Sequence, residues 1–166
     1  MTIPGCGNFS RCPNVGRFRT VQRYDALFAS QDDNGIAMTL ELKMLALSIV
    51  LGLVHVVLAS HAASLQRGYV WTASSRDEAV PELTGVAGRL ERALHNFVET
   101  FPLFAAAVLT THVAATHSWM TEWGTQLYFW ARVVYLALYA AGIFLLRSLV
   151  WNVATLGIVL ILLSLV

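Results

Sequence analysis

Charged residues are scarce in this 166-residue chain: 13% of its positions are Asp, Glu, Lys or Arg, whereas 57% are hydrophobic. Soluble domains usually have about 25% charged and about 45–50% apolar residues. The low charge excludes a disordered chain, and the net charge of +1 gives no basic surface on which to build a nucleic-acid binder. Because so few charges cannot cover a soluble domain of this length, we expect an integral membrane protein whose partners include the lipid bilayer but no nucleic acid.

Cysteine is also rare, and the only two, Cys6 and Cys12, fall within the first twelve residues. They have neither the number expected of a disulfide-stapled secreted module nor the spacing of a metal site. The histidines add no metal pair, because neighbouring histidines are not four residues apart on a predicted helix face. The two pairs concerned are His55 with His61 and His112 with His117. No metal site is therefore predicted.

Four stretches are mostly apolar over roughly 20 residues, the length that a helix needs to cross the core of a bilayer. They are Met44–Ala63, Leu94–Ala115, Leu127–Leu146 and Leu149–Val166. The last two are joined by a very short loop around Arg147, which makes their helices antiparallel neighbours. The predicted fold is all-α, an integral membrane four-helix bundle that crosses the bilayer several times.

Residues 1–37 differ from the rest, since they are rich in Gly, Asn, Asp and Arg and lack the apolar segment of a secretory signal. Five Lys or Arg residues fall on each side of the four spans in the full chain, so the positive-inside rule gives no orientation. Counted from Met38, the balance becomes one against five. We hypothesise that residues 1–37 are a misplaced start or a disordered extension and that residues 38–166 form the four-span domain. We further expect the 64–93 loop to be cytoplasmic in a bacterial inner membrane.

A polar stripe runs along the second span, where Arg89, Arg92, Asn96 and Glu99 recur at steps of three, four and three. Such spacing places side chains on one helix face. Ionisable groups inside a span are costly and normally face a cavity or a partner. Cations, an amide and a carboxylate in one column suit a zwitterionic ligand that carries both carboxylate and amine groups. The alternative is that Glu99 pairs with Arg92 or Asn96 and only fastens helices together.

The third span repeats this spacing with Arg132, Tyr135 and Tyr139. Counted from the expected helix end at Leu146, Tyr139 lies about 10 Å deep at 1.5 Å per residue, a depth comparable with that of Glu99. Arg132 lies only five residues from the opposite end of the span. It is therefore expected either to share the face of the tyrosines or to extend its guanidinium to the other membrane surface.

Together these motifs resemble those of the MAPEG family, the membrane-associated proteins of eicosanoid and glutathione metabolism. The likeness extends from about Met38 to Val166 and fits a bacterial-type member. Thr100 departs from the pattern, because members that use glutathione often carry tyrosine directly after the glutamate. The matching residues are Arg92, Ala93, Asn96, Glu99 and Phe101–Phe104 on the second span, and Ala131, Arg132, Tyr135 and Tyr139 on the third.

The resemblance implies a homotrimer that binds glutathione between neighbouring protomers near the cytoplasmic face. It implies that Arg92 holds a glutathione carboxylate, that Asn96 hydrogen-bonds the glutathione backbone and that Glu99 takes its amino group. Tyr135 and Tyr139 would line the same pocket.

The family also has an arginine near the junction of the third and fourth spans that stabilises the thiolate, and Arg147 matches it with a shift of one residue. That role is physically sensible, since a nearby cation lowers the pKa of a thiol. The implied activity is that of a glutathione-dependent transferase or peroxidase acting on lipophilic electrophiles. Two alternatives stay open: a non-enzymatic small membrane protein whose polar stripe packs helices or binds lipid headgroups, and a haem-binding bundle.

Overall fold

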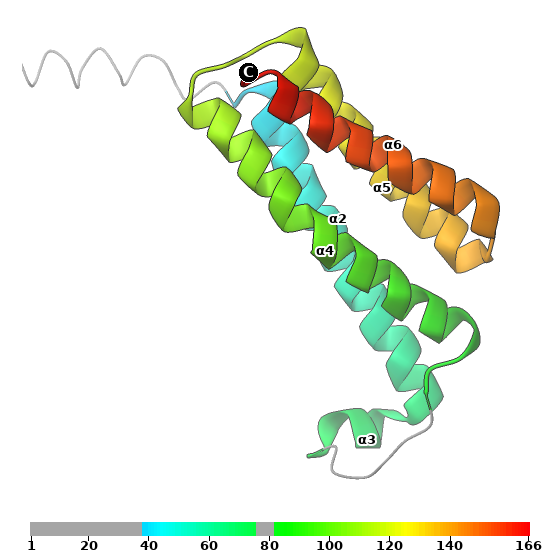
Figure 1. Ribbon diagram of the computed structural model, residues 1–166. Helices are drawn as coiled ribbons and strands as arrows, with labels where there is room; N and C mark the ends of the chain where they lie inside the picture. Colours follow the sequence, from blue (N-terminus) through cyan, green and yellow to red (C-terminus); the bar gives the residue numbers. More distant parts are fainter. Residues whose placement is uncertain (1–37, 76–81) are drawn as a thin grey trace, which may run out of the picture. The chain divides into compact units, whose positions relative to one another are not determined.

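The computed structural model describes residues 38–75 and 82–166, so the hypothesis about residues 1–37 lies outside the described residues. Every regular element in those two ranges is an α-helix, which confirms the predicted all-α fold. Four helices are long and one, α3, has only five residues (Figure 1). The helices are α2 (Leu40–Arg67), α3 (Tyr69–Ala73), α4 (Gly85–Val113), α5 (Trp119–Ala141) and α6 (Phe144–Leu163).

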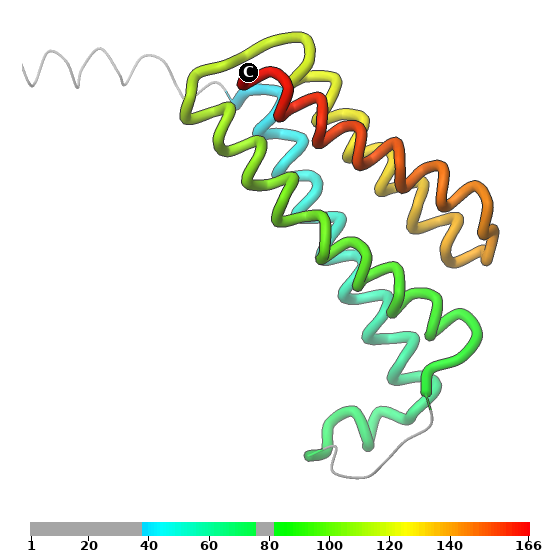
Figure 2. The backbone as a smooth tube through the Cα atoms, in the orientation of Figure 1, coloured from blue at the N-terminus to red at the C-terminus, as the bar shows by residue number. Residues whose placement is uncertain are grey.

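The four long helices alternate in direction, so that α2 begins, α4 ends, α5 begins and α6 ends at one end of the bundle (Figure 2). Their common core contains side chains from all four, including Leu45 of α2 and Ile161 of α6. At its centre the rings of Phe104 and Tyr128 stack with centroids 3.9 Å apart and planes inclined by 8°. This aromatic pair joins α4 to α5 in the middle of the bundle.

A pair of glycines brings the backbones of α5 and α6 into direct contact. A Cβ atom on Gly124 would lie 2.7 Å from the carbonyl oxygen of Gly157, and a Cβ on Gly157 would lie 2.6 Å from that of Gly124. No larger residue fits at either position without moving a helix. Small residues at such crossings are typical of membrane helices, which gain stability from close packing rather than from the hydrophobic effect.

Three of the long helices, α2, α4 and α6, are long and apolar enough to cross a membrane. The fourth, α5, has 23 residues and extends for about 34 Å, comparable with a bilayer core of about 30 Å. It carries Glu122 and Arg132 and several polar residues in its first half, so it contains no stretch of 18 residues as apolar as those of the other three. Composition therefore identifies three of the four predicted spans, and α5 is long enough to be the fourth.

The boundary between the last two helices differs from the sequence prediction. α5 ends at Ala141 instead of continuing to Leu146, and Gly142 caps it in the left-handed conformation with φ of 85°. The N–H groups of Gly142 and Ile143 both donate to the carbonyl of Leu138, at 3.0 and 3.1 Å, as in a glycine-terminated helix. Arg147 consequently lies near the start of α6 rather than in a loop, and Tyr139 lies about 3 Å from the end of α5 instead of about 10 Å.

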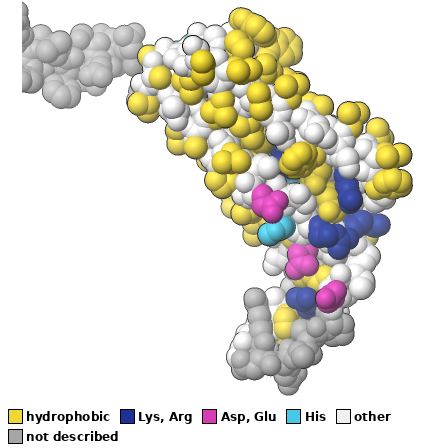
Figure 3. Space-filling model, viewed as in Figure 1, with side chains coloured by type: hydrophobic (Ala, Val, Ile, Leu, Met, Phe, Trp, Pro, Cys, Tyr) yellow, Lys and Arg dark blue, Asp and Glu magenta, His cyan; other side chains and the backbone are white. Residues whose placement is uncertain are grey.

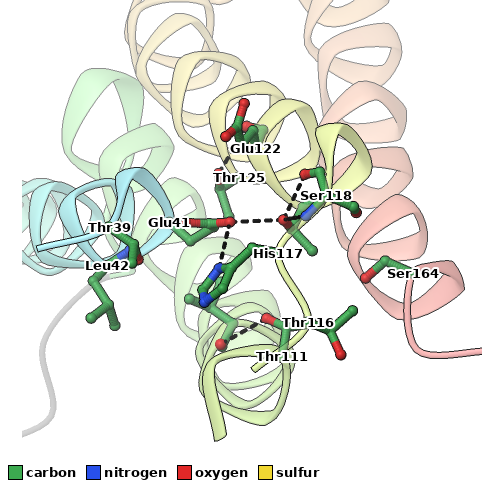
Figure 4. A network of polar contacts seen from close by, with 12 residues as sticks. Thr39, Glu41, Leu42, Thr111, Thr116, His117, Ser118, Glu122, Thr125 and Ser164 are labelled. Atoms are coloured by element: carbon green, nitrogen blue, oxygen red, sulfur yellow. Dashed lines mark hydrogen bonds and ion pairs between the residues drawn. The ribbon is translucent and has the colours of Figure 1, made fainter. Parts of the chain in front are cut away.

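A buried carboxylate ties the first long helix to the start of α5. Glu41 is only 5% exposed, and its Oε1 accepts a hydrogen bond from Thr121 Oγ1 at 2.8 Å and lies 3.3 Å from Nδ1 of His117 (Figure 4). Thr121 also belongs to the capping box that begins α5 with Ser118. The network fixes the end of the bundle at which α2 begins.

Candidate functional site

A polar pocket of about 250 Å³ lies between α4, α5 and the first half of α6. It brings together four of the six site residues that the sequence indicated, which are Asn96, Tyr135, Tyr139 and Arg147. Three further residues of α6 complete its lining: Ser148, Trp151 and Asn152.

The two tyrosines form the α5 wall of the pocket. They are four residues apart, so they lie one above the other on the same helix face, and their ring centroids are 5.2 Å apart. Both are almost fully buried, at 4% and 5% exposed, and both belong to one buried cluster with Ala93 of α4. The guanidinium carbon of Arg147 lies 4.6 Å from the ring centroid of Tyr139, a cation–π distance. The cation is thus held over the aromatic wall.

Two asparagines give the pocket hydrogen-bond acceptors. Asn96 donates from Nδ2 to the carbonyl of Arg92 at 2.9 Å, and Asn152 donates from Nδ2 to that of Ser148 at 2.8 Å. Each amide nitrogen uses one of its two N–H groups within its own helix, so each amide keeps its oxygen as an acceptor, besides one N–H donor, for a ligand. The Ser148 hydroxyl also donates to its own helix, at 3.2 Å to Phe144. The pocket therefore combines a cation, two phenols and amide oxygens, which suits a ligand with both an anionic group and N–H donors.

Arg92 and Glu99 do not line this pocket, although they belong to the same stripe on α4. Both are exposed, and in the described part of the chain the partner of Glu99 is His95, at 3.2 Å between Nε2 and Oε1, rather than Arg92 or Asn96. Figure 3 shows positive, negative and histidine side chains together on the half of the bundle that holds the start of α4, whereas the other half is largely hydrophobic. Within one chain, the stripe therefore does not fasten α4 to another helix through Glu99.

The other two arginines of the sequence motifs are turned toward the bundle. Arg132 is 0% exposed and donates from Nη2 to the hydroxyl of Thr100, so the expectation that it reaches the opposite membrane surface is wrong. Arg89 is half-buried, and its Nη1 lies 2.8 Å from the place that a Cβ on Gly142 would occupy. The sequence could not predict this contact of Arg89, because the turn that contains Gly142 was expected further along the chain, around Arg147.

Apart from Arg147, sequence reasoning missed the pocket residues that α6 contributes. Ser148 and Asn152 are polar residues four apart in an otherwise apolar span, a signal like the one that pointed to the stripe on the second span. Trp151 gave no such signal, because tryptophans near the ends of a span are usual interfacial anchors.

A haem-binding bundle would need histidines within the spans, and the structure places His55 and His112 in different surroundings. His55 is 1% exposed, its Nδ1 lies 2.9 Å from the carbonyl of Leu51 on its own helix, and its ring stacks on Phe97 with centroids 4.7 Å apart. His112 is exposed at the end of α4, with its ring 6.0 Å from that of His117. Among the residues that the structure describes, no cluster of three or more His, Cys, Asp or Glu side chains could hold a metal ion.

Long apolar helices and a largely hydrophobic exterior define an integral membrane helical bundle, and the polar pocket between α4, α5 and α6 is its candidate site. The chain matches the model of the MAPEG family over residues 44–166, and it belongs to this family. The matched region includes the four long helices from the fifth residue of α2 onward and every residue that lines the pocket. Neither the comparison with curated proteins nor that with solved structures gives a match.

Proposed function

We propose that this protein is a glutathione-dependent transferase or peroxidase that acts on lipophilic electrophiles. The observation that carries the proposal is the pocket that unites Asn96, Tyr135, Tyr139 and Arg147. Glutathione has two carboxylates, an ammonium group, two amides and a thiol. The amide oxygens of the pocket would accept from its N–H groups, and the Arg147 guanidinium would face its thiolate.

The thiolate is the reactive form of a thiol, and a cation close to the sulfur raises the fraction of thiolate at neutral pH. In transfer, the sulfur of glutathione would attack an electrophilic carbon of the substrate, form a C–S bond and displace a leaving group or open a strained ring. In peroxide reduction, the thiolate would attack a peroxide oxygen, which breaks the O–O bond, releases an alcohol and leaves a sulfenic acid on glutathione. A second glutathione thiol would then displace this hydroxyl as water and form the disulfide. Arg147 is proposed as the catalytic residue in both reactions.

An apolar groove of about 270 Å³ on the outer side of α5 and α6 supports the choice of a lipophilic substrate. Two of its residues, Val134 and Val150, directly precede the pocket residues Tyr135 and Trp151 in the sequence. The groove thus runs close to the polar pocket on helices that face lipid. An electrophile dissolved in the bilayer would reach the sulfur from this side.

Arg92 and Glu99 are proposed to complete the glutathione site from the exposed side of α4. Both are accessible, and together they supply the carboxylate-binding cation and the ammonium-binding anion that the pocket itself lacks. A site that is half pocket and half outer helix surface is complete only when a neighbouring protomer covers it. We therefore propose a homotrimer with glutathione bound between protomers.

Calorimetry with glutathione on the detergent-purified full-length protein tests the proposal. We expect binding by the wild type and binding at least tenfold weaker in Arg92→Ala and in Glu99→Ala, because each variant loses a hydrogen-bonded charge pair, a loss of about 1.5–3 kcal/mol. Glu91→Ala is the matched control, since Glu91 is an exposed carboxylate beside Arg92 that does not belong to the stripe.

Absence of heat with the wild type, or equal affinity in all four proteins, would contradict the glutathione site. The alternative role of the stripe, binding of lipid headgroups, predicts a different outcome. In that case the two variants would lose bound phospholipid in native mass spectrometry, and added glutathione would not compete.

A further inference from the structure

Arg132 is a cation buried within the helices of the membrane domain. It lies near the middle of α5 and is 0% exposed. Its Nη2 donates to Thr100 Oγ1 on α4, whereas Nε and Nη1 have no hydrogen-bond partner among the residues that the structure describes. Burial of a charge is costly unless the charge is well paired. One hydrogen bond to a neutral hydroxyl is little compensation, so stability alone does not explain an arginine at this place.

Aromatic rings hold the guanidinium in one orientation. Its carbon lies 5.5 Å from the ring centroid of Tyr128 and 5.3 Å from that of Tyr135, both on α5. The hydroxyl of Tyr128 lies 3.4 Å from Thr100 Oγ1, and its ring stacks on Phe104 of α4. A planar cation between two rings is fixed by both of them. The arginine therefore couples the position of Tyr135 to that of α4.

The Arg132–Thr100 contact lies directly below the polar pocket. Thr100 is one helical turn beyond Asn96 on α4, and Arg132 is one turn before Tyr135 on α5. Asn96 lines the pocket from α4 and Tyr135 lines it from α5. Side chains three or four residues apart lie on adjacent turns of one helix face. The hydrogen bond between the two helices is thus the first link beneath the pocket, and it fixes the distance between α4 and α5 there.

We propose that Arg132 and Thr100 are positioning residues that form the floor of the pocket and hold Tyr135, and through it Tyr139, in place for the ligand. This inference rests on the proposed function, because glutathione is the ligand used to probe it. It also gives Thr100 a role at the position where the family often has tyrosine. Lysine cannot replace Arg132, because an ammonium group has no plane to lie between two rings while it donates to Thr100.

Steady-state kinetics with glutathione and a lipophilic electrophile separate positioning from a loss of folded protein. In Thr100→Val, which removes the hydroxyl and keeps the shape, we expect the KM for glutathione to rise about tenfold, as for loss of one hydrogen bond to a charged group. We expect the same rise of the KM for glutathione in Arg132→Lys. The KM for the electrophile stays unchanged, because neither Thr100 nor Arg132 lines the apolar groove. Thr100→Ser retains the hydroxyl and stays close to the wild type.

Thr110→Val is the matched control. Thr110 is an exposed threonine on the same helix, and its hydroxyl donates to the carbonyl of Ala106 of its own helix at 2.8 Å. We expect wild-type constants for this variant. If Thr100→Val and Arg132→Lys lower kcat alone and leave both KM values unchanged, the pair serves only the stability of the fold, and the proposal is overturned.

A second measurement needs no ligand. Trp151 packs against Ala93, Tyr135 and Tyr139, so its fluorescence reports on the tyrosine wall. In a protein with Trp151 as the only tryptophan, we expect its emission maximum to shift in Thr100→Val and Arg132→Lys, but not in Thr100→Ser or Thr110→Val. If the wild type binds no glutathione, the proposed function fails, but the fluorescence of Trp151 still tests the positioning role of Arg132 and Thr100. An unchanged emission maximum in all four variants would refute that positioning role. The background substitutions are W71F, W119F, W123F and W130F.

Discussion

At the scale of single residues, Arg147 is the pocket residue whose binding and catalytic contributions can be separated most cleanly. Its guanidinium lies over the ring of Tyr139 and belongs to the pocket lining. The proposed task of this cation is to stabilise the thiolate, whereas Asn96 and the exposed charges of α4 would hold the rest of glutathione. Removal of the cation should therefore change the reactivity of the sulfur more than the affinity of the ligand.

For Arg147→Ala we expect kcat to fall about a hundredfold, the effect of removing one group that stabilises a reacting anion, while the Kd for glutathione changes by less than threefold. Ultraviolet absorbance of the bound thiolate, titrated against pH, should show a higher thiol pKa in the variant. Arg67→Ala is the matched control, because Arg67 is also stacked on an aromatic ring, with its guanidinium carbon 5.2 Å from the Trp71 centroid, but lies outside the pocket. Equal thiol pKa values in Arg147→Ala and the wild type would contradict the assigned role.

Most pocket residues could be predicted because helical spacing survives folding. Tyr135 and Tyr139 share a helix face wherever α5 lies, and Asn96 follows from the polar pattern of α4. Which residues of the pattern face the pocket could not be predicted, because this depends on how α4 is rotated against α5. That rotation leaves Glu99 outside, paired with His95, and it buries Arg132.

At the scale of elements, the existence of the four long helices followed from apolar run length, but the end of α5 did not. Residues 143–146 are all apolar and continue the hydrophobic run across the turn, so hydropathy gives no boundary there. Gly142 was the one local signal, as a residue that adopts the left-handed conformation of a helix cap. The Glu41 network was also missed, because a carboxylate near the start of a helix is ordinarily a solvated residue.

The contact between Gly124 and Gly157 predicts a strong effect of adding one methyl group. In Gly157→Ala the new Cβ meets backbone atoms of α5, at 2.6 Å from the Gly124 oxygen and 2.9 Å from the Tyr128 nitrogen. Backbone cannot yield as a side chain does, so α5 and α6 must separate, at a cost of about 1–3 kcal/mol. We expect a clearly lower thermal unfolding midpoint in detergent.

Gly52→Ala is the control for this substitution. Its Cβ would meet ring atoms of Phe97, the closest at 2.9 Å, and that side chain can shift. The expected loss of stability is therefore smaller than in Gly157→Ala. The reverse order of the two midpoints would show that the glycine contact does not limit the packing of α5 on α6.

At the scale of the whole molecule, the distribution of arginines predicts an orientation in the membrane. If the 64–93 loop is cytoplasmic, as the count from Met38 favours, the start of α5 faces the other side. In a protein with Cys6 and Cys12 replaced by serine, a membrane-impermeant maleimide added to intact cells should label Glu122→Cys but label Ser75→Cys only after lysis. Both positions are exposed. Labelling of Ser75→Cys in intact cells would show that the orientation is the opposite of the one predicted.

The buried arginine of α5 has a consequence for the order in which the chain is built into the membrane. A guanidinium at the centre of an isolated membrane helix costs about 2.5–3.5 kcal/mol on insertion scales. Its hydrogen-bond acceptor, Thr100, lies on α4, which the ribosome completes earlier, and the glycine contact that seats α5 lies on α6, which is completed later. The stability of α5 in the bilayer therefore depends on the helices synthesised before and after it. When α5 is inserted, α4 is already in the membrane.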